Sequence, residues 1–338
     1  MPKSIRWGIA SIVLSLCLSS CTGNRRPEVV VYASLDELYS RPILEEFERV
    51  TGIRARVRYD SEASKTTGLV NRLIAERNRP GADVYWSNEL IQTVRLKQEG
   101  LLAPYASHMA QEFPAHFKDP EGYWTGFAAR ARVIIYNTDL VDDPPRSLQD
   151  FTDAEWKGLA AIANPLFGTT AAHAAALFAA WGDEKAEAYF HALKANDIAI
   201  LPENATVRDL VARGEYAVGL TDTDDANGAV LDGFPVRWHL AENDSALGAT
   251  LVLPNTVALI EGGPNGEHAK ALIDYLLSPE VEEALAASRA IQIPLNPEAA
   301  TPENVPVISS ITRMDIDFAI AAEKWPRVAS FIETEFLP

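Results

Sequence analysis

The chain has 338 residues, with 47 Asp and Glu against 30 Lys and Arg, so its formal net charge is −17 at pH 7. This acidic excess argues against nucleic-acid binding and against a basic membrane-binding face, because both need clustered Lys and Arg. The two cysteines, Cys17 and Cys21, both lie near the N-terminus, so we expect neither a disulfide nor a thiolate metal site in the rest of the chain.

The N-terminus has the order of an export signal. Two basic residues precede an apolar run from Trp7 to Leu18, and small residues then lead to Cys21. This run is shorter than the roughly 20 apolar residues of a membrane span. We therefore predict that residues 1–20 are a cleaved lipoprotein signal peptide, that Cys21 carries lipid, and that residues 21–28 form a tether. The alternative is a plain secretory signal with an incidental cysteine.

Strand and helix patterns alternate after the tether. Continuous β-branched residues at 29–32 predict a buried strand typical of parallel sheets. A helix with a periodic apolar face is predicted from Pro42 to Val50, ending at Gly52. The same alternation predicts strands at 53–59 and 82–86 and helices at 66–77 and 91–99. This order indicates an α/β domain with a mainly parallel sheet.

A second α/β unit is predicted to follow the first. Its strands are expected at 127–136, 160–163 and 217–220, and its helices at 169–181, 185–195 and 207–213. The chain then continues with an apolar run at 251–260, helices at 267–277 and 279–288, and a largely helical stretch at 308–336.

Polar residues follow the predicted strands, at the edge where ligands of parallel α/β sheets bind. Two of these loops open helices, and helix N-termini favour anions. Capping of the helices would by itself account for any single loop. Taken together, the loops predict a cleft whose candidate residues are Ser34, Asp36, Asn88, Gly168, Thr169, Thr170, Asn204, Asp222, Asp224 and Asp225.

Three carboxylates within four residues, Asp222, Asp224 and Asp225, form the most unusual cluster. Such groups repel one another unless a cation or hydrogen-bond donors compensate them, and oxygen-only ligands suit hard cations. The alternative is that they cap the next helical turn. Catalytic signatures such as G-x-S-x-G, H-E-x-x-H and a Walker loop are absent from the sequence.

Several segments in order, among them ADVYWSNE, GFAARARVIIYNTDLV, GEYAVGLTDTDDA and LVLPNTVALIEGGPNGEHAKALIDYLLSPEVEEAL, resemble the periplasmic ferric-ion-binding proteins of ABC importers. The resemblance implies an α/β, two-lobed type II periplasmic-binding-protein fold with a ligand cleft between lobes joined by two hinge strands. Lobe 1 would comprise residues 29–128 and 252–338, and lobe 2 residues 129–251. Closure of the cleft would be a hinge motion.

The resemblance also assigns roles to the cleft. The iron-ligand positions of the family fall on Asp36, Asn88, Asp224 and Asp225, with the last two replacing adjacent tyrosines. Its anion-holding loop falls on Gly168, Thr169 and Thr170, beside Asn204 and Asp222. Arg130 and Arg132 lie where the family often has a cleft arginine, and we expect Arg132 to bind the ligand unless it pairs with nearby acids. The expected metal ligands are Asp36, Asp224 and Asp225. Tyr39 and Trp86 are candidates to pack against the ligand, with core packing an equal alternative for Trp86.

The expected function is that of a lipid-anchored solute-binding protein of the cell envelope. It would deliver iron(III) or another hard metal ion, held with a synergistic anion, to an ABC importer permease by cleft closure. We expect a monomer that has no cofactor, catalyses nothing and touches the membrane only through its lipid. One alternative is a small organic solute such as a phosphonate, polyamine or thiamine-like molecule. A less favoured alternative is an exported metal-dependent hydrolase using Asp224 and Asp225.

Overall fold

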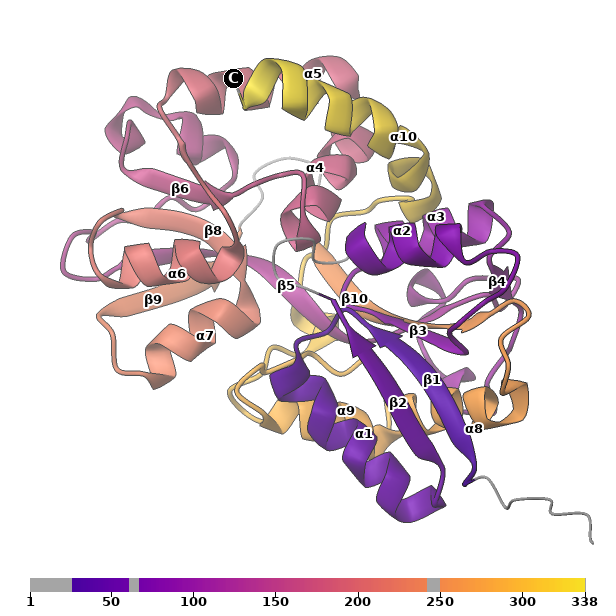
Figure 1. The fold of residues 1–338 in the computed structure, drawn as a ribbon. Helices are drawn as coiled ribbons and strands as arrows, with labels where there is room; N and C mark the ends of the chain where they lie inside the picture. Colours follow the sequence, from indigo (N-terminus) through magenta and orange to yellow (C-terminus); the bar gives the residue numbers. More distant parts are fainter. Residues whose placement is uncertain (1–25, 61–66, 242–249, 338) are drawn as a thin grey trace, which may run out of the picture.

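The computed structural model describes residues 26–60, 67–241 and 250–337. The predicted signal peptide and the lipidation site at Cys21 lie outside these residues. Within them, the helices are too short or too polar to cross a membrane. Strands and helices alternate along the chain as an α/β fold, as predicted (Figure 1).

The described strands form one sheet in the order β2-β1-β3-β10-β5-β8-β6-β7, with β4 paired to β10 and β9 paired to β5. The first group of strands is β1 (Glu28–Ala33), β2 (Arg54–Tyr59), β3 (Val84–Ser87), β4 (Leu102–Ala103) and β10 (Val252–Ile260). The second group is β6 (Ala160–Ala163), β7 (Ala199–Leu201), β8 (Val218–Asp222) and β9 (Val236–Leu240). The strand β5 (Thr125–Asn137) belongs to both.

The long strand β5 joins the two groups. Its first half, up to Ala131, pairs antiparallel with β10, and its second half, from Arg132, pairs antiparallel with β8 and β9. The register of β10 against β5 shifts between Leu253 and Asn255. Figure 1 shows β5 and β10 running between the two groups of strands. The lobe boundaries given above stay a prediction.

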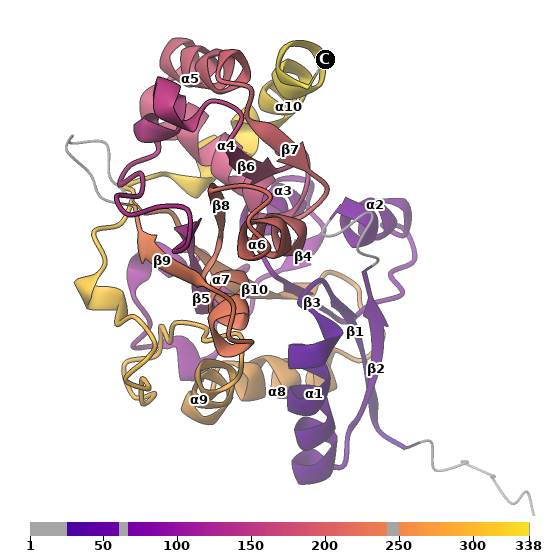
Figure 2. The same cartoon turned by 90° about the vertical axis from the view of Figure 1, so that its left-hand side faces the viewer.

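Helices cover both groups of strands. Around the first group lie α1 (Glu37–Thr51), α2 (Thr67–Ala75), α3 (Ile91–Gln98), α8 (Gly266–Leu276) and α9 (Pro279–Ala287). Around the second lie α4 (Gly168–Trp181), α5 (Asp183–Ala195), α6 (Asn204–Ala212) and α7 (Thr223–Leu231). Helix α10 (Phe318–Phe331) packs against both α3 and α4, and a π-helical turn, Ile332–Phe336, follows it. In Figure 2, α1, α8 and α9 lie together on the side opposite α5 and α10.

Two predicted elements differ from the structure. Helix α1 begins at Glu37, before the predicted start at Pro42, because the N–H groups of Tyr39 and Ser40 already donate to the Asp36 carbonyl. Pro42 is tolerated because the carbonyl that it leaves unpaired belongs to the exposed Leu38 in the first turn. The C-terminal helix begins only at Phe318, where the Asp317 carboxylate accepts hydrogen bonds from two helix N–H groups.

The aromatic residue Trp86 lies in the core. Its side chain on β3 is fully buried, and its ring lies 5.7 Å from that of Phe127 on β5. Of the two expectations for Trp86, core packing is therefore the one that the structure confirms, because the indole is fully buried and does not line the cavity that lies between the two groups of strands. The same burial fixes β3 against β5, and so positions the loop after β3 beside the cleft.

Candidate functional site

A cavity of about 830 Å³ lies between the two groups of strands. The first group contributes Asp36 before α1 and Asn88 after β3, and the joining strand β5 contributes Arg130. The remaining lining comes from the second group: the segment before and at the start of α4, the segment before α6, and the start of α7. These residues are Ala163, Asn164, Phe167, Gly168, Thr169, Thr170, Ile200, Leu201, Pro202, Glu203, Asn204, Ala205, Asp222, Asp224 and Asp225.

The structure brings together all the predicted site residues except Ser34 and Arg132. Ser34 is buried and does not line the cavity, and its hydroxyl lies 3.3 Å from the Tyr85 hydroxyl. Arg132 lies behind the cavity wall with only 2% of its surface exposed. Arg130 lines the cavity instead. The alternation of side chains along a strand places both arginines on the same face, so the pattern could not tell which one reaches the cavity.

Behind the wall, the two terminal nitrogens of Arg132 make a hydrogen-bond network, whereas its buried Nε has no partner among the described residues. One guanidinium nitrogen donates to Asp222 Oδ1 at 2.7 Å and to Asn204 Oδ1 at 3.1 Å. The other donates to the Leu220 carbonyl at 3.3 Å. Because both partners of the Arg132–Asp222 pair are buried, the pair is well shielded from water.

The second oxygen of Asp222 is also engaged. Thr169 Oγ1 donates to Asp222 Oδ2 at 2.5 Å, and Asn204 Nδ2 donates to the same oxygen at 3.1 Å. Burial raises the pKa of Asp222, but the charges of Arg132 and Arg130 and the Thr169 hydrogen bond outweigh it, so the pKa lies below its usual value. Asp222 is therefore a carboxylate held by protein donors from three directions.

Asp224 and Asp225, in the first turn of α7, face the cavity and are partly exposed. Oxygen atoms of Asp222, Asp224 and Asp225 all lie within 4.8 Å of one another. Burial, followed by the charges of Asp222 and Asp36, raises the pKa of Asp224 to about 6 against the opposing effect of Arg130. Burial and the charge of Asp224 hold the pKa of Asp225 well above its usual value. A bound cation would relieve this repulsion.

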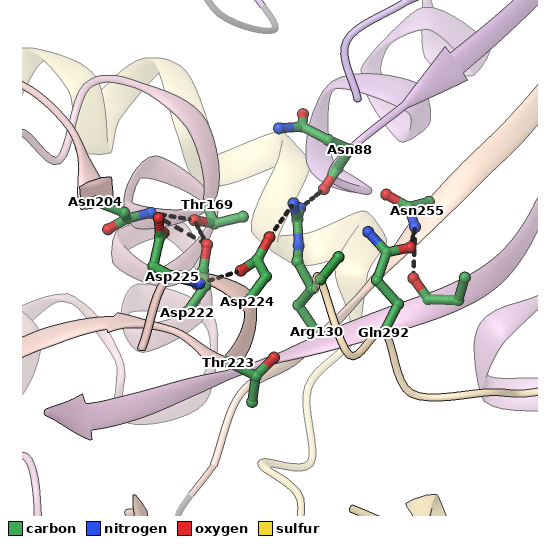
Figure 3. Close-up of polar contacts among 12 residues, drawn as sticks. Asn88, Arg130, Thr169, Asn204, Asp222, Thr223, Asp224, Asp225, Asn255 and Gln292 are labelled. Atoms are coloured by element: carbon green, nitrogen blue, oxygen red, sulfur yellow. Dashed lines mark hydrogen bonds and ion pairs between the residues drawn. The ribbon is translucent and has the colours of Figure 1, made fainter. Parts of the chain in front are cut away.

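Arg130 connects the two sides of the cavity (Figure 3). One of its guanidinium nitrogens lies 3.6 Å from Asp224 Oδ2, and the other donates to the carbonyl of Asn88. The charge of Asp224 is the largest influence that raises the pKa of Arg130, against the opposing effect of burial. The cationic side chain thus links α7 to the loop after β3.

Tyr39, on α1, does not line the cavity, but its phenol is influenced by the cavity carboxylates. Burial, followed by the charges of Asp224, Asp36 and Asp225, raises the pKa of Tyr39 to about 12. The phenol therefore lies in the field of the same carboxylates. In the part of the chain that the structure describes, no histidine or cysteine lines the cavity, so a metal ion bound by these residues would have oxygen ligands, which suit hard cations.

Comparison with known proteins gives a consistent result. The family model described as bacterial extracellular solute-binding protein matches residues 79–324. Iron uptake protein A1 of Synechocystis sp. is 26% identical over 322 residues, which cover 88% of each chain. A periplasmic protein of Salmonella typhi to which 2-aminoethylphosphonate binding is ascribed is 30% identical over 242 residues, 70% of this chain and 68% of that protein.

Among solved structures, that of iron-bound HitA from Pseudomonas aeruginosa resembles the fold closely. It superposes with a TM-score of 0.81 at 23% sequence identity, covering 90% of this chain and 99% of HitA. The predicted two-lobed type II periplasmic-binding-protein fold is thereby confirmed.

Proposed function

The chain belongs to the bacterial extracellular solute-binding protein family, and we propose that it captures a hard metal cation, foremost iron(III), for delivery to an ABC importer. The observation that carries this proposal is the convergence of carboxylates on one cavity: oxygen atoms of Asp222, Asp224 and Asp225 lie within 4.8 Å of one another, and Asp36 lines the same cavity. Arg130 and Arg208 lie 3.6 Å from Asp224 and 3.7 Å from Asp225, yet the pKa values of both carboxyls remain raised. Two relatives matched over most of the chain support the same ligand by their names, which are iron uptake protein A1 and the major ferric iron-binding protein of Neisseria meningitidis.

Delivery would depend on closure of the cavity. Asp36 and Asn88 come from the first group of strands, whereas Asp224 and Asp225 come from the second. A cation bound to carboxylates from both sides stabilises the arrangement in which the two groups lie close together, because it binds that arrangement more tightly. The permease would then recognise the closed form.

The proposed function also includes a lobe division, a membrane anchor and a monomeric state. We propose lobe 1 at residues 29–128 and 252–338, lobe 2 at residues 129–251, and a lipid anchor at Cys21 that holds a monomer in the cell envelope. The protein would bind and release its ligand without catalysing a reaction, as the names of the relatives, which are those of uptake and binding proteins, suggest.

A second ligand class is a small organic solute with an amine. Among the described residues, the cavity lining carries five carboxylates, Asp36, Glu203, Asp222, Asp224 and Asp225, and one guanidinium, that of Arg130. This charge imbalance favours any compact cation, and the phosphonate ascribed to the Salmonella typhi relative carries an amine.

Thermal unfolding of the soluble form beginning at Thr22 tests the proposal. The panel would contain Fe³⁺ supplied as its nitrilotriacetate complex, Mn²⁺, Ca²⁺, 2-aminoethylphosphonate, a polyamine and thiamine. A ligand at a hundredfold excess over its Kd stabilises the folded state by about 2.7 kcal/mol, which gives a clear shift.

The variants Asp224→Asn and Asp225→Asn should abolish the shift with Fe³⁺, whereas Asp142→Asn, in an exposed loop, should retain it. A shift with an amine and none with any metal would assign the cavity to the second ligand class. A metal shift that survives both cavity variants would show that the metal binds elsewhere.

A further inference from the structure

The donors that converge on Asp222 are the feature that the proposed function does not yet explain. They comprise the Arg132 guanidinium, the Thr169 hydroxyl and the Asn204 amide, and all three come from different elements, β5, α4 and α6. Figure 3 shows the Thr169 and Asn204 side chains meeting at Asp222 on the side of the cavity away from Asn88. A positively charged group with neutral donors at two helix starts is the arrangement that proteins use to hold an anion.

In this chain the anion that these donors hold is the protein's own carboxylate. Both oxygens of Asp222 accept hydrogen bonds, at 2.7 Å from Arg132 and at 2.5 Å from Thr169. The amide oxygen of Asn204 also has a partner, because Asn204 Oδ1 accepts a hydrogen bond from Thr170 Oγ1 at 3.1 Å. The Arg132 charge is therefore compensated before any ligand arrives.

We propose that Asp222 determines the charge of the ligand: its carboxylate occupies the donors that would otherwise hold an anionic group, so the cavity binds a cation without a co-bound anion. The inference rests on the proposed function, because it concerns the same cavity. In this proposal the Asp222 carboxylate takes the place of the synergistic anion that the family resemblance implied. The proposal also distinguishes a metal cation from an organic ligand that carries an anionic group.

An anionic ligand group would have to displace the Asp222 carboxylate from its donors. A phosphate or phosphonate that reached Arg132 and Thr169 would lie against the buried Asp222 carboxylate, and two anions at that distance repel strongly in a shielded site. Asp222 cannot move into water without leaving Arg132 buried and unpaired. A cation would not be repelled in this way, because the carboxylates of Asp224 and Asp225, in the first turn of α7, face the cavity.

Calorimetric titration of the wild-type protein gives the first test. Fe³⁺ from its nitrilotriacetate complex is titrated in buffer free of phosphate and carbonate, then again with an excess of phosphate. We expect an apparent Kd that stays within about twofold, and no binding of phosphate or 2-aminoethylphosphonate alone. Tightening of about tenfold or more by phosphate would overturn the inference, and so would binding of either anion alone by the wild-type protein.

Variants give the second test. Asp222→Ala frees the donors, so Fe³⁺ binding should become dependent on added formate or phosphate, tightening about tenfold or more when the anion is present. Asp222→Asn, which keeps the shape but loses the charge, should gain weak phosphate binding, and it serves if the alanine variant does not fold. Asp142→Asn is the matched control and should behave as wild type.

The outcomes separate the two proposals. Fe³⁺ binding that needs an anion in the wild-type protein contradicts the role of Asp222 but leaves metal capture intact. Failure of every metal in the panel to bind contradicts the proposed function itself. If the Fe³⁺ affinity of the Asp222→Ala protein does not change on addition of formate or phosphate, that result also contradicts the proposed role of Asp222.

Discussion

The guanidinium of Arg130 and the carboxylate of Asp224 lie 3.6 Å apart, at the place where β5 passes from one group of strands to the other. Arg130 is almost fully buried, and its remaining nitrogen at the end of the fork donates to the carbonyl of Asn88 on the opposite side of the cavity. One cationic side chain thus restrains both a candidate metal ligand and the loop facing it. Its charge also keeps Asp224 partly ionised despite burial.

Removing that charge should change the titration of Asp224. In Arg130→Gln we expect the pKa of Asp224 to rise above its wild-type value of about 6, because Arg130 is the main influence that lowers it. The carboxyl ¹³C chemical shift, followed as a function of pH by NMR, measures this directly. Arg208→Gln is the control, since Arg208 lowers the pKa of Asp225, so the Asp225 signal should move instead. An unchanged Asp224 titration in Arg130→Gln would contradict the assignment.

The stability of the ligand-free protein should depend on pH through the same residue. The pKa of Asp224 is about 6 in the folded protein, and that of an unfolded Asp is about 3.9. Between these values the folded protein binds more protons than the unfolded chain, so the contribution of Asp224 to stability falls as the pH rises. Urea unfolding at about pH 4.5 and about pH 7.5 should therefore show the wild-type protein losing stability relative to Asp224→Asn. Asp142→Asn should follow the wild type, and a difference independent of pH would refute the expectation.

Much of the fold could be predicted because it depends on local patterns. The β-branched run at 29–32 and the periodic helices around it needed no knowledge of their neighbours. Strand β9 (Val236–Leu240) was not predicted, since its half-buried residues acquire a regular pattern only when paired with β5. The true start of α1 was hidden by Pro42, which local rules place at a helix start.

The candidate site was predictable to the level of its loops but not of its contacts. Strand ends and helix starts identified Asp36, Thr169, Asn204 and the acidic cluster, and these residues do lie around one cavity. The sequence could not show that Asp222 is hydrogen-bonded to protein donors, because Arg132, Thr169 and Asn204 are distant along the chain. Asp222 and Asp224 are two positions apart in the chain, and their different surroundings arise only from tertiary structure.

The buried pair of Arg132 and Asp222 should show strong energetic coupling. Asp222→Ala leaves the Arg132 charge buried without its partner, and breaking such a pair typically costs about 3–5 kcal/mol. Replacing both, as Arg132→Met with Asp222→Ala, should destabilise the protein by clearly less than the sum of the two single changes. Urea unfolding of the four proteins measures the coupling, and additive effects would argue against a functional ion pair.

The packing of β8 against α6 positions Asp222 beside Asn204, and it depends on a glycine. A Cβ built on Gly219 in β8 would lie 2.5 Å from Val207 Cγ1 and 3.1 Å from Val211 Cγ2, both on α6. Gly219→Ala should therefore push α6 away from the sheet and destabilise the protein by about 1–3 kcal/mol, as overpacking of a core does.

The same displacement separates Asn204 from Asp222, whose hydrogen bond is 3.1 Å long, so the Fe³⁺ affinity of Gly219→Ala should fall together with its stability. Gly266→Ala provides the control: this glycine begins α8, and its added methyl group would have no atom within 4 Å. Because alanine favours a helix over glycine, that variant should unfold at equal or higher urea concentration and bind Fe³⁺ as wild type. Equal stability of the two alanine variants would show that α6 yields to the added methyl group without strain, and that the Val207 contact does not hold the site in place.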